Sequence, residues 1–85
     1  MKCFQFTVTD PFGIHARPAG MLVKLCSSFQ SQISVTTPAG TADGKRLIQW
    51  MRLAIKQGTV LSFYVEGPDE DRASAELETF LLANL

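Results

Sequence analysis

The chain contains 85 residues, 46% of them hydrophobic, and its eight basic and eight acidic side chains give a formal net charge of zero. This length predicts one small domain over residues 1–85, and basic residues that are sparse and not interleaved with aromatics disfavour nucleic-acid binding. No apolar run approaches the ~18–20 residues that span a bilayer, and the N-terminus resembles no signal peptide, so we expect no membrane insertion and a cytoplasmic location. Because cytoplasmic cysteines are rarely paired, we expect free, buried, unreactive thiols at Cys3 and Cys26.

The first predicted elements are a strand and a helix. Apolar and polar side chains alternate from Phe4 to Val8, which is typical of a half-buried strand. Residues 10–13 (Asp-Pro-Phe-Gly) then predict a loop. A helix begins at Ala16, with Pro18 in its first turn, where a missing N–H is tolerated. The apolar stripe of this helix comprises Ala16, Ala19, Leu22, Val23 and Cys26.

A hairpin and a second helix follow. Residues 33–36 and 41–43 predict two strands, and the tight turn at 38–40 between them implies antiparallel pairing. Apolar residues then predict a short helix over 47–54. We expect Gly58 to cap this helix, since glycine readily adopts the left-handed conformation at helix ends.

The last predicted elements are a strand and a helix. The strand covers residues 60–65, and a turn at 67–69 follows it. Asp69 is a plausible N-cap of the final helix. The order βαββαβα predicts an α+β fold in which helices pack on one face of a mainly antiparallel sheet. The inner stripe of the final helix comprises Ala73, Leu77, Phe80 and Leu81.

Histidine occurs once, as His15, in the run from Gly13 to Gly20. Arg17 and Pro18 follow it at the predicted start of a helix. Such an end offers unpaired backbone N–H groups and the positive end of the helix dipole, which together suit a phosphoryl group. Because a neutral imidazole nitrogen is a nucleophile, the run predicts a phosphoryl-transfer site. The alternative is that His15 is an ordinary loop or cap residue.

The charges are unevenly distributed along the chain. Residues 1–57 carry seven basic and two acidic side chains, a net charge of +5, whereas residues 58–85 carry one basic and six acidic ones, a net charge of −5. The basic part contains His15, toward which it could steer an anionic ligand or an acidic protein surface. The alternative interpretation is that these are ordinary solvated charges together with one acidic helix.

The predicted helix at 47–54 holds more apolar side chains than one buried face of a short helix can accept. We expect Trp50 to belong to the core, whereas Ile48 and Met51 point elsewhere at helical spacing. Some of these side chains must therefore be exposed, and an exposed apolar patch implies a protein partner.

The run Gly13-Ile14-His15-Ala16-Arg17-Pro18-Ala19 strongly resembles the active-site signature of the HPr family. These are the histidine-containing phosphocarrier proteins of the bacterial phosphoenolpyruvate-dependent sugar phosphotransferase system. The resemblance covers nearly the whole chain, because the length and element order also fit and residues 57–60 and 66–70 are similar to the family's segments around its last strand. It implies an open-faced β-sandwich, in which a four-stranded antiparallel sheet carries three helices on one face.

The resemblance also implies a function. His15 would accept a phosphoryl group from Enzyme I through Nδ1 and pass it to a IIA-type domain for carbohydrate uptake, so the protein would be a carrier rather than an enzyme. Arg17 would neutralise the transferring group, and the backbone N–H groups of Ala16 and Arg17 would hold its oxygens. We expect a monomer with no metal or other cofactor. The implied docking residues are Gly20, Met21, Lys24, Leu47, Ile48 and Met51.

Four positions depart from the usual pattern of the family. Arg46 stands where many members carry a regulatory serine, so a phosphorylation switch at that position should be absent. Phe12 replaces a small polar residue, Ser27 a frequent lysine, and Trp50 a smaller apolar residue. These departures keep open a second interpretation, a divergent HPr-like protein that docks on a partner and regulates it outside sugar transport. A third is an α+β scaffold that binds a small anion at the helix start.

Overall fold

The computed structural model describes residues 1–85 and contains four strands and three helices in the order βαββαβα. The element order predicted from the sequence is therefore confirmed. The elements are β1 (Lys2–Thr7), α1 (Ala16–Ser27), β2 (Gln32–Thr37), β3 (Gly40–Asp43), α2 (Leu47–Arg52), β4 (Val60–Glu66) and α3 (Glu70–Asn84).

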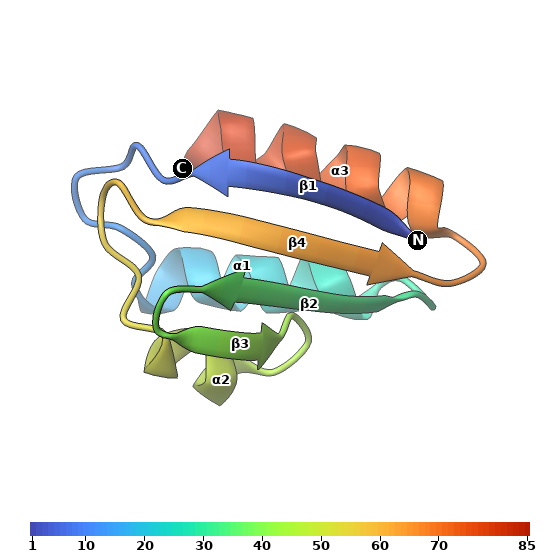
Figure 1. Cartoon of the computed structure of the whole chain (residues 1–85), viewed down its shortest axis with the longest axis horizontal. Coiled ribbons are helices and arrows are strands. Elements are labelled where there is room, and N and C mark those ends of the chain that lie inside the picture. The colour runs from blue at the N-terminus through green and yellow to red at the C-terminus, as the bar shows by residue number, and fades with distance from the viewer.

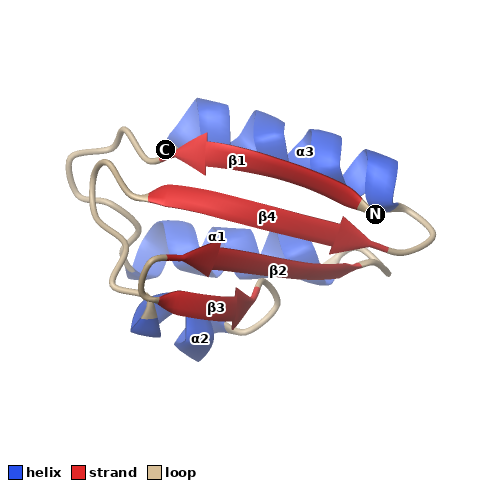
Figure 2. Cartoon of the chain, in the orientation of Figure 1, coloured by secondary structure: helices blue, strands red, loops and turns tan.

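The four strands form one antiparallel sheet in the spatial order β1-β4-β2-β3. The last strand in the sequence thus lies between the first two, and Phe63 is opposite Phe4 on one side and Val35 on the other. All three helices cover the same face of this sheet and leave the other face open (Figures 1 and 2). No helix combines the length and the apolar character needed to cross a membrane. The predicted open-faced sandwich is confirmed.

The core lies between the sheet and the helices. Phe63 is at its centre, because strand alternation on β4 points Phe63 toward the helices. Its ring stacks on Phe4, with ring centroids 4.8 Å apart, and lies 6.1 Å from Trp50. Trp50 is only 1% exposed, and its indole N–H donates a hydrogen bond of 2.9 Å to the carbonyl of Gly44. The prediction that Trp50 is a core residue is confirmed.

Two of the predicted burials are wrong. Cys3 is exposed rather than buried, because its register opposite Tyr64 directs it to the open face of the sheet. Cys26 is buried as predicted, and burial raises the pKa of its thiol to about 12. Ala16, predicted to lie on the buried stripe of α1, is exposed because it begins the open end of that helix. Pro18 is buried in its place.

The second helix is shorter than predicted. It ends at Arg52 with Leu53 as its C-cap, and Ala54 then adopts the left-handed conformation, with φ of +48°. Leu53 and Ile55 are both buried, and a continuing helix would not direct residues two apart to the same face. Gly58 therefore does not cap α2; it lies in the turn before β4.

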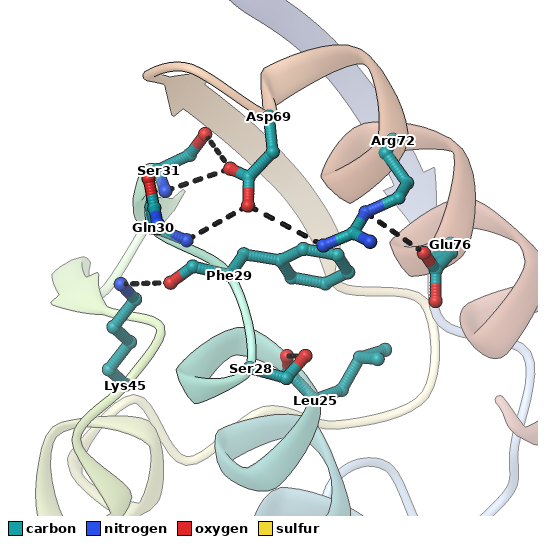
Figure 3. Close-up of polar contacts among 9 residues, drawn as sticks. All are labelled: Leu25, Ser28, Phe29, Gln30, Ser31, Lys45, Asp69, Arg72 and Glu76. Atoms are coloured by element: carbon teal, nitrogen blue, oxygen red, sulfur yellow. Dashed lines mark hydrogen bonds and ion pairs between the residues drawn. The ribbon is translucent and has the colours of Figure 1, made fainter.

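A cluster of polar contacts joins the three helices at one end of the molecule (Figure 3). Asp69 occupies the N-cap position of α3, as predicted, but its side chain does not cap its own helix. Its carboxylate accepts hydrogen bonds from the backbone N–H groups of Gln30 and Ser31, at 3.0 and 2.9 Å, and from the hydroxyl of Ser31. These bonds, that of the Ser31 hydroxyl foremost, lower the pKa of Asp69 to about 2.

Phe29 links the other two helices to this cluster. The ammonium of Lys45, just before α2, donates a hydrogen bond of 2.9 Å to the carbonyl of Phe29. The guanidinium of Arg72 on α3 lies 5.1 Å from the centroid of the Phe29 ring. Lys45 therefore joins the start of α2 to the chain that leaves α1.

Substitution of Ala54 by glycine should stabilise the protein. A side chain in the left-handed region costs roughly 1–2 kcal/mol, and the exposed Ala54 methyl contributes little burial in return. After the greater freedom of glycine in the unfolded chain is subtracted, we expect the free energy of unfolding to rise by about 0.5–1 kcal/mol. Urea denaturation followed by Trp50 fluorescence measures it. The matched control, Ala75→Gly within α3, should instead destabilise the protein by about 1 kcal/mol. Destabilisation by both substitutions would contradict the left-handed conformation of Ala54.

The Asp69 cluster should make stability depend on acid pH. Because the folded pKa of Asp69 lies below that of an unfolded aspartate, its contribution is complete above about pH 4 and is lost as the pH falls toward 2. Asp69→Asn should therefore be less stable than the wild type at pH 7. The difference between their free energies of unfolding should become smaller between pH 4 and pH 2. Urea titrations at each pH test this. Glu78→Gln, on the exposed surface of α3, is the control, and its difference from the wild type should not change with pH. A constant difference for Asp69→Asn as well would refute the prediction.

Candidate functional site

The loop between β1 and α1 carries the predicted signature and is held by backbone hydrogen bonds to two distant segments. Val8 pairs with the turn before β4, donating to Thr59 at 3.0 Å and accepting from Gly58 at 2.8 Å. The next two backbone N–H groups, of Thr9 and Asp10, both donate to the oxygen of Leu85, at 2.8 and 3.0 Å. The loop is therefore fastened to the end of α3 as well as to the sheet.

Gly13 sets the close approach of this loop to the chain that leaves α2. Its φ is +64°, and a Cβ at this position would overlap the carbonyl oxygen of Ile55 and lie 2.8 Å from the Cα of Lys56. The adjacent N–H of Ile14 donates a hydrogen bond of 3.1 Å to the same carbonyl. Only glycine fits, and the contact brings the start of α1 beside the end of α2.

His15 is the N-cap residue of α1 and is exposed. Neither nitrogen of its ring makes a hydrogen bond within the protein, and its side chain does not cap the helix. The backbone N–H groups of Ala16 and Arg17 have no partner either, since an α-helix leaves its first N–H groups unpaired and no loop residue bonds them. Pro18 has no N–H, and the N–H of Ala19 is already bonded to the carbonyl of His15.

This arrangement can bind an anion beside the imidazole. Two free N–H donors and the positive end of the α1 dipole lie next to a nucleophilic ring that faces solvent. Arg17 is exposed and forms no ion pair, so its guanidinium is free to meet a negative charge. No three histidine, cysteine, aspartate or glutamate side chains lie together in a way that could hold a metal ion.

The side chain of His15 makes an aromatic contact with Phe12. The two ring centroids are 6.4 Å apart and the planes are inclined by 87°, an edge-on arrangement. Phe12 is itself 81% exposed. The sequence indicated only that Phe12 replaces a small polar residue; the aromatic contact depends on the path of the loop.

The predicted docking residues lie on α1 and α2, two helices that contact each other. Four of them are exposed large apolar side chains, and Ile48 is the most exposed at 64%. Gly20 is partly exposed and faces open space, and Lys24 is exposed without an ion pair. Arg46, the N-cap residue of α2, is also exposed and unpaired. We call the exposed apolar set the docking patch; it comprises Met21, Leu47, Ile48 and Met51.

Sequence reasoning missed the role of Asp10. Its carboxylate accepts a hydrogen bond of 2.8 Å from the N–H of Phe12, and its carbonyl accepts one of 3.0 Å from Gly13. An aspartate two residues before the N–H it binds is the ordinary pattern of an Asx turn, so this half of its role was readable. The bond from its own N–H to Leu85 joins the loop before α1 to the residue that follows α3 and has no local signal.

Comparisons with known proteins identify the family to which this chain is related. A family model described as "PTS HPr component phosphorylation site" matches residues 2–83. The phosphocarrier protein HPr of Lysinibacillus sphaericus is 51% identical over 81 residues, which cover 95% of this chain and 92% of that protein.

Solved structures agree as well. The histidine-containing phosphocarrier protein of Mycoplasma matches with a TM-score of 0.92 at 32% identity, over 96% of this chain and 93% of that one. A structure described as an HPr dimer from Thermoanaerobacter tengcongensis matches with a TM-score of 0.77 at 32% identity, over 98% and 95% of the two chains. This chain therefore belongs to the HPr family, and it is a phosphocarrier of the phosphotransferase system.

Proposed function

We propose that residues 1–85 act as one phosphocarrier domain in which His15 accepts a phosphoryl group from Enzyme I and donates it to a IIA-type domain. The observation that carries this proposal is the exposed, unpartnered imidazole beside the free N–H groups of Ala16 and Arg17. A phosphoryl group on the ring would find these donors in reach without any rearrangement of the helix.

The chemistry needs no group beyond those of the two proteins. The lone pair of His15 Nδ1 attacks phosphorus, and a nitrogen–phosphorus bond forms while the bond between phosphorus and the donor breaks, its electron pair staying with the donor. The N–H groups of Ala16 and Arg17, the helix dipole and the Arg17 guanidinium oppose the negative charge of the oxygens. In the second transfer the IIA nucleophile attacks phosphorus, and His15 recovers its lone pair.

The docking patch supports the use of one surface by successive partners. It lies on the two helices whose packing also positions His15, and the cations of Arg17, Lys24 and Arg46 near it are unpaired. An apolar centre with a basic rim suits an acidic protein surface. We infer a cytoplasmic monomer, since a self-association that covered the patch would exclude both partners; the dimer described for Thermoanaerobacter tengcongensis is a property of that protein.

Loss of the imidazole should abolish phosphorylation. With phosphoenolpyruvate and an Enzyme I, the wild type should acquire an acid-labile phosphate and His15→Ala should acquire none, because the chain has no other histidine. Mass spectrometry at neutral and acid pH measures this. Glu78→Gln on α3 is the control and should be labelled like the wild type. Acid-labile labelling that survives in His15→Ala would show that the phosphoryl acceptor is elsewhere.

A charge placed in the docking patch should weaken partner binding without changing the chemistry. Ile48→Asp buries an unpaired carboxylate in the complex, so we expect the KM for the carrier to rise about tenfold or more while kcat is nearly unchanged. Leu82→Asp is the matched control, since Leu82 on α3 is 77% exposed but lies outside the patch. Steady-state phosphotransfer with varied carrier measures both. Equal effects of the two substitutions would argue against a specific docking surface.

The same variants separate the carrier from a purely regulatory docking protein, which the exposed Phe12 and Arg46 would also allow. A regulatory partner should bind His15→Ala as well as it binds the wild type, and should lose Ile48→Asp. Isothermal titration calorimetry with each candidate partner distinguishes the two roles.

A further inference from the structure

The ring of His15 has no hydrogen bond to hold it, yet phosphoryl transfer depends on the direction of one ring nitrogen. Phe12 is its only aromatic neighbour, at a centroid separation of 6.4 Å and an inclination of 87°. These values fall within the range of favourable edge-to-face pairs. The ring of Phe12 is therefore placed where it can limit the rotation of the imidazole.

The position of Phe12 is not explained by the core. Its side chain is 81% exposed, so burial supplies little of the energy that would keep it in one place. Its backbone is instead held by Asp10, whose carboxylate accepts the Phe12 N–H at 2.8 Å. Asp10 is itself fastened through its own N–H to Leu85 at 3.0 Å. The backbone of an exposed aromatic residue is thus held near His15 by a turn with two anchors.

We propose that Phe12, held by the Asp10 turn, is a positioning residue that restricts the imidazole of His15 to the orientation presented for phosphoryl transfer. This inference rests on the proposed role of His15 and assigns to Phe12 an effect on the transfer step rather than on partner docking. Edge-to-face pairs contribute enough to bias a ring orientation by about two- to tenfold. We therefore expect an effect of that size on the transfer rate at saturating donor.

Substitutions at position 12 test the contact directly. Phe12→Leu keeps an apolar side chain but removes the ring, and should slow transfer at saturating phosphorylated Enzyme I by about two- to tenfold. Phe12→Tyr keeps the ring and should restore the wild-type rate. In proton–carbon NMR spectra, the resonances of the His15 ring should move in Phe12→Leu, because the ring current of Phe12 is lost, and should stay close to the wild type in Phe12→Tyr.

Substitutions at Asp10 test how Phe12 is held. Asp10→Ala leaves the aromatic ring in the chain but removes the acceptor of the Phe12 N–H, and should reproduce part of the Phe12→Leu effect on both rate and spectrum. Asp10→Asn keeps a side-chain oxygen acceptor and should behave like the wild type. Tyr64→Leu is the control for loss of an exposed aromatic ring, since Tyr64 lies on the open face of the sheet.

Three results would overturn the inference. The first is a His15 spectrum in Phe12→Leu that differs from the wild type no more than that of Tyr64→Leu. The second is an unchanged saturating rate in Phe12→Leu. The third is a change in KM alone, which would make Phe12 a docking residue. Each is read with wild-type protein that is phosphorylated on His15, so failure of the positioning role is distinguishable from failure of the proposed function.

Discussion

The close approach of Gly13 to the carbonyl of Ile55 is the constraint on which the functional end of this molecule depends. There the loop before α1 and the chain leaving α2 touch through their backbones, and the Ile14 N–H closes the contact at 3.1 Å. A side chain at position 13 would push the two segments apart. Because α1 starts just after this contact, it also determines where His15, the free N–H groups of the first turn and the docking patch stand relative to one another.

The opposite end of α1 is held by a different set of contacts. Asp69 binds the chain that leaves α1, and Lys45 and Arg72 bring α2 and α3 to Phe29 (Figure 3). Three charge-assisted hydrogen bonds converge on the Asp69 carboxylate, so the cluster behaves as a unit rather than as separate surface pairs. With backbone packing at one end and a carboxylate cluster at the other, α1 has a defined direction, and its free N–H groups point out of the domain beside His15.

The side chains that stabilise the fold and those proposed to meet a partner lie in different parts of the structure. Core side chains lie between the sheet and the helices, with Phe63 and Trp50 at the centre. The apolar side chains that do not fit there are left exposed on the outside of α1 and α2, which is typical of a surface that binds another protein. A small carrier that must meet two partners in turn can use such an arrangement, since its core does not change when the patch is covered.

Much of this was readable from the sequence, because the signals are local. Period-two and helical spacing predicted the order of elements, the single histidine before a first-turn proline predicted the site, and the excess of apolar residues around Ile48 predicted an exposed patch. The signature around His15 also carried the family resemblance. Each of these depends on residues within a few positions of one another, so one chain is enough to recognise it.

The tertiary structure alone decided the features that join distant segments. The end of α2 at Arg52 follows from the need to bury both Leu53 and Ile55, which spacing in a helix could not anticipate. The exposure of Cys3 follows from its register in β1, and the capture of the loop at Asp10 follows from its bond to Leu85. The residues proposed to react are thus determined by local sequence. How they are held is decided by contacts between parts of the chain that only folding brings together.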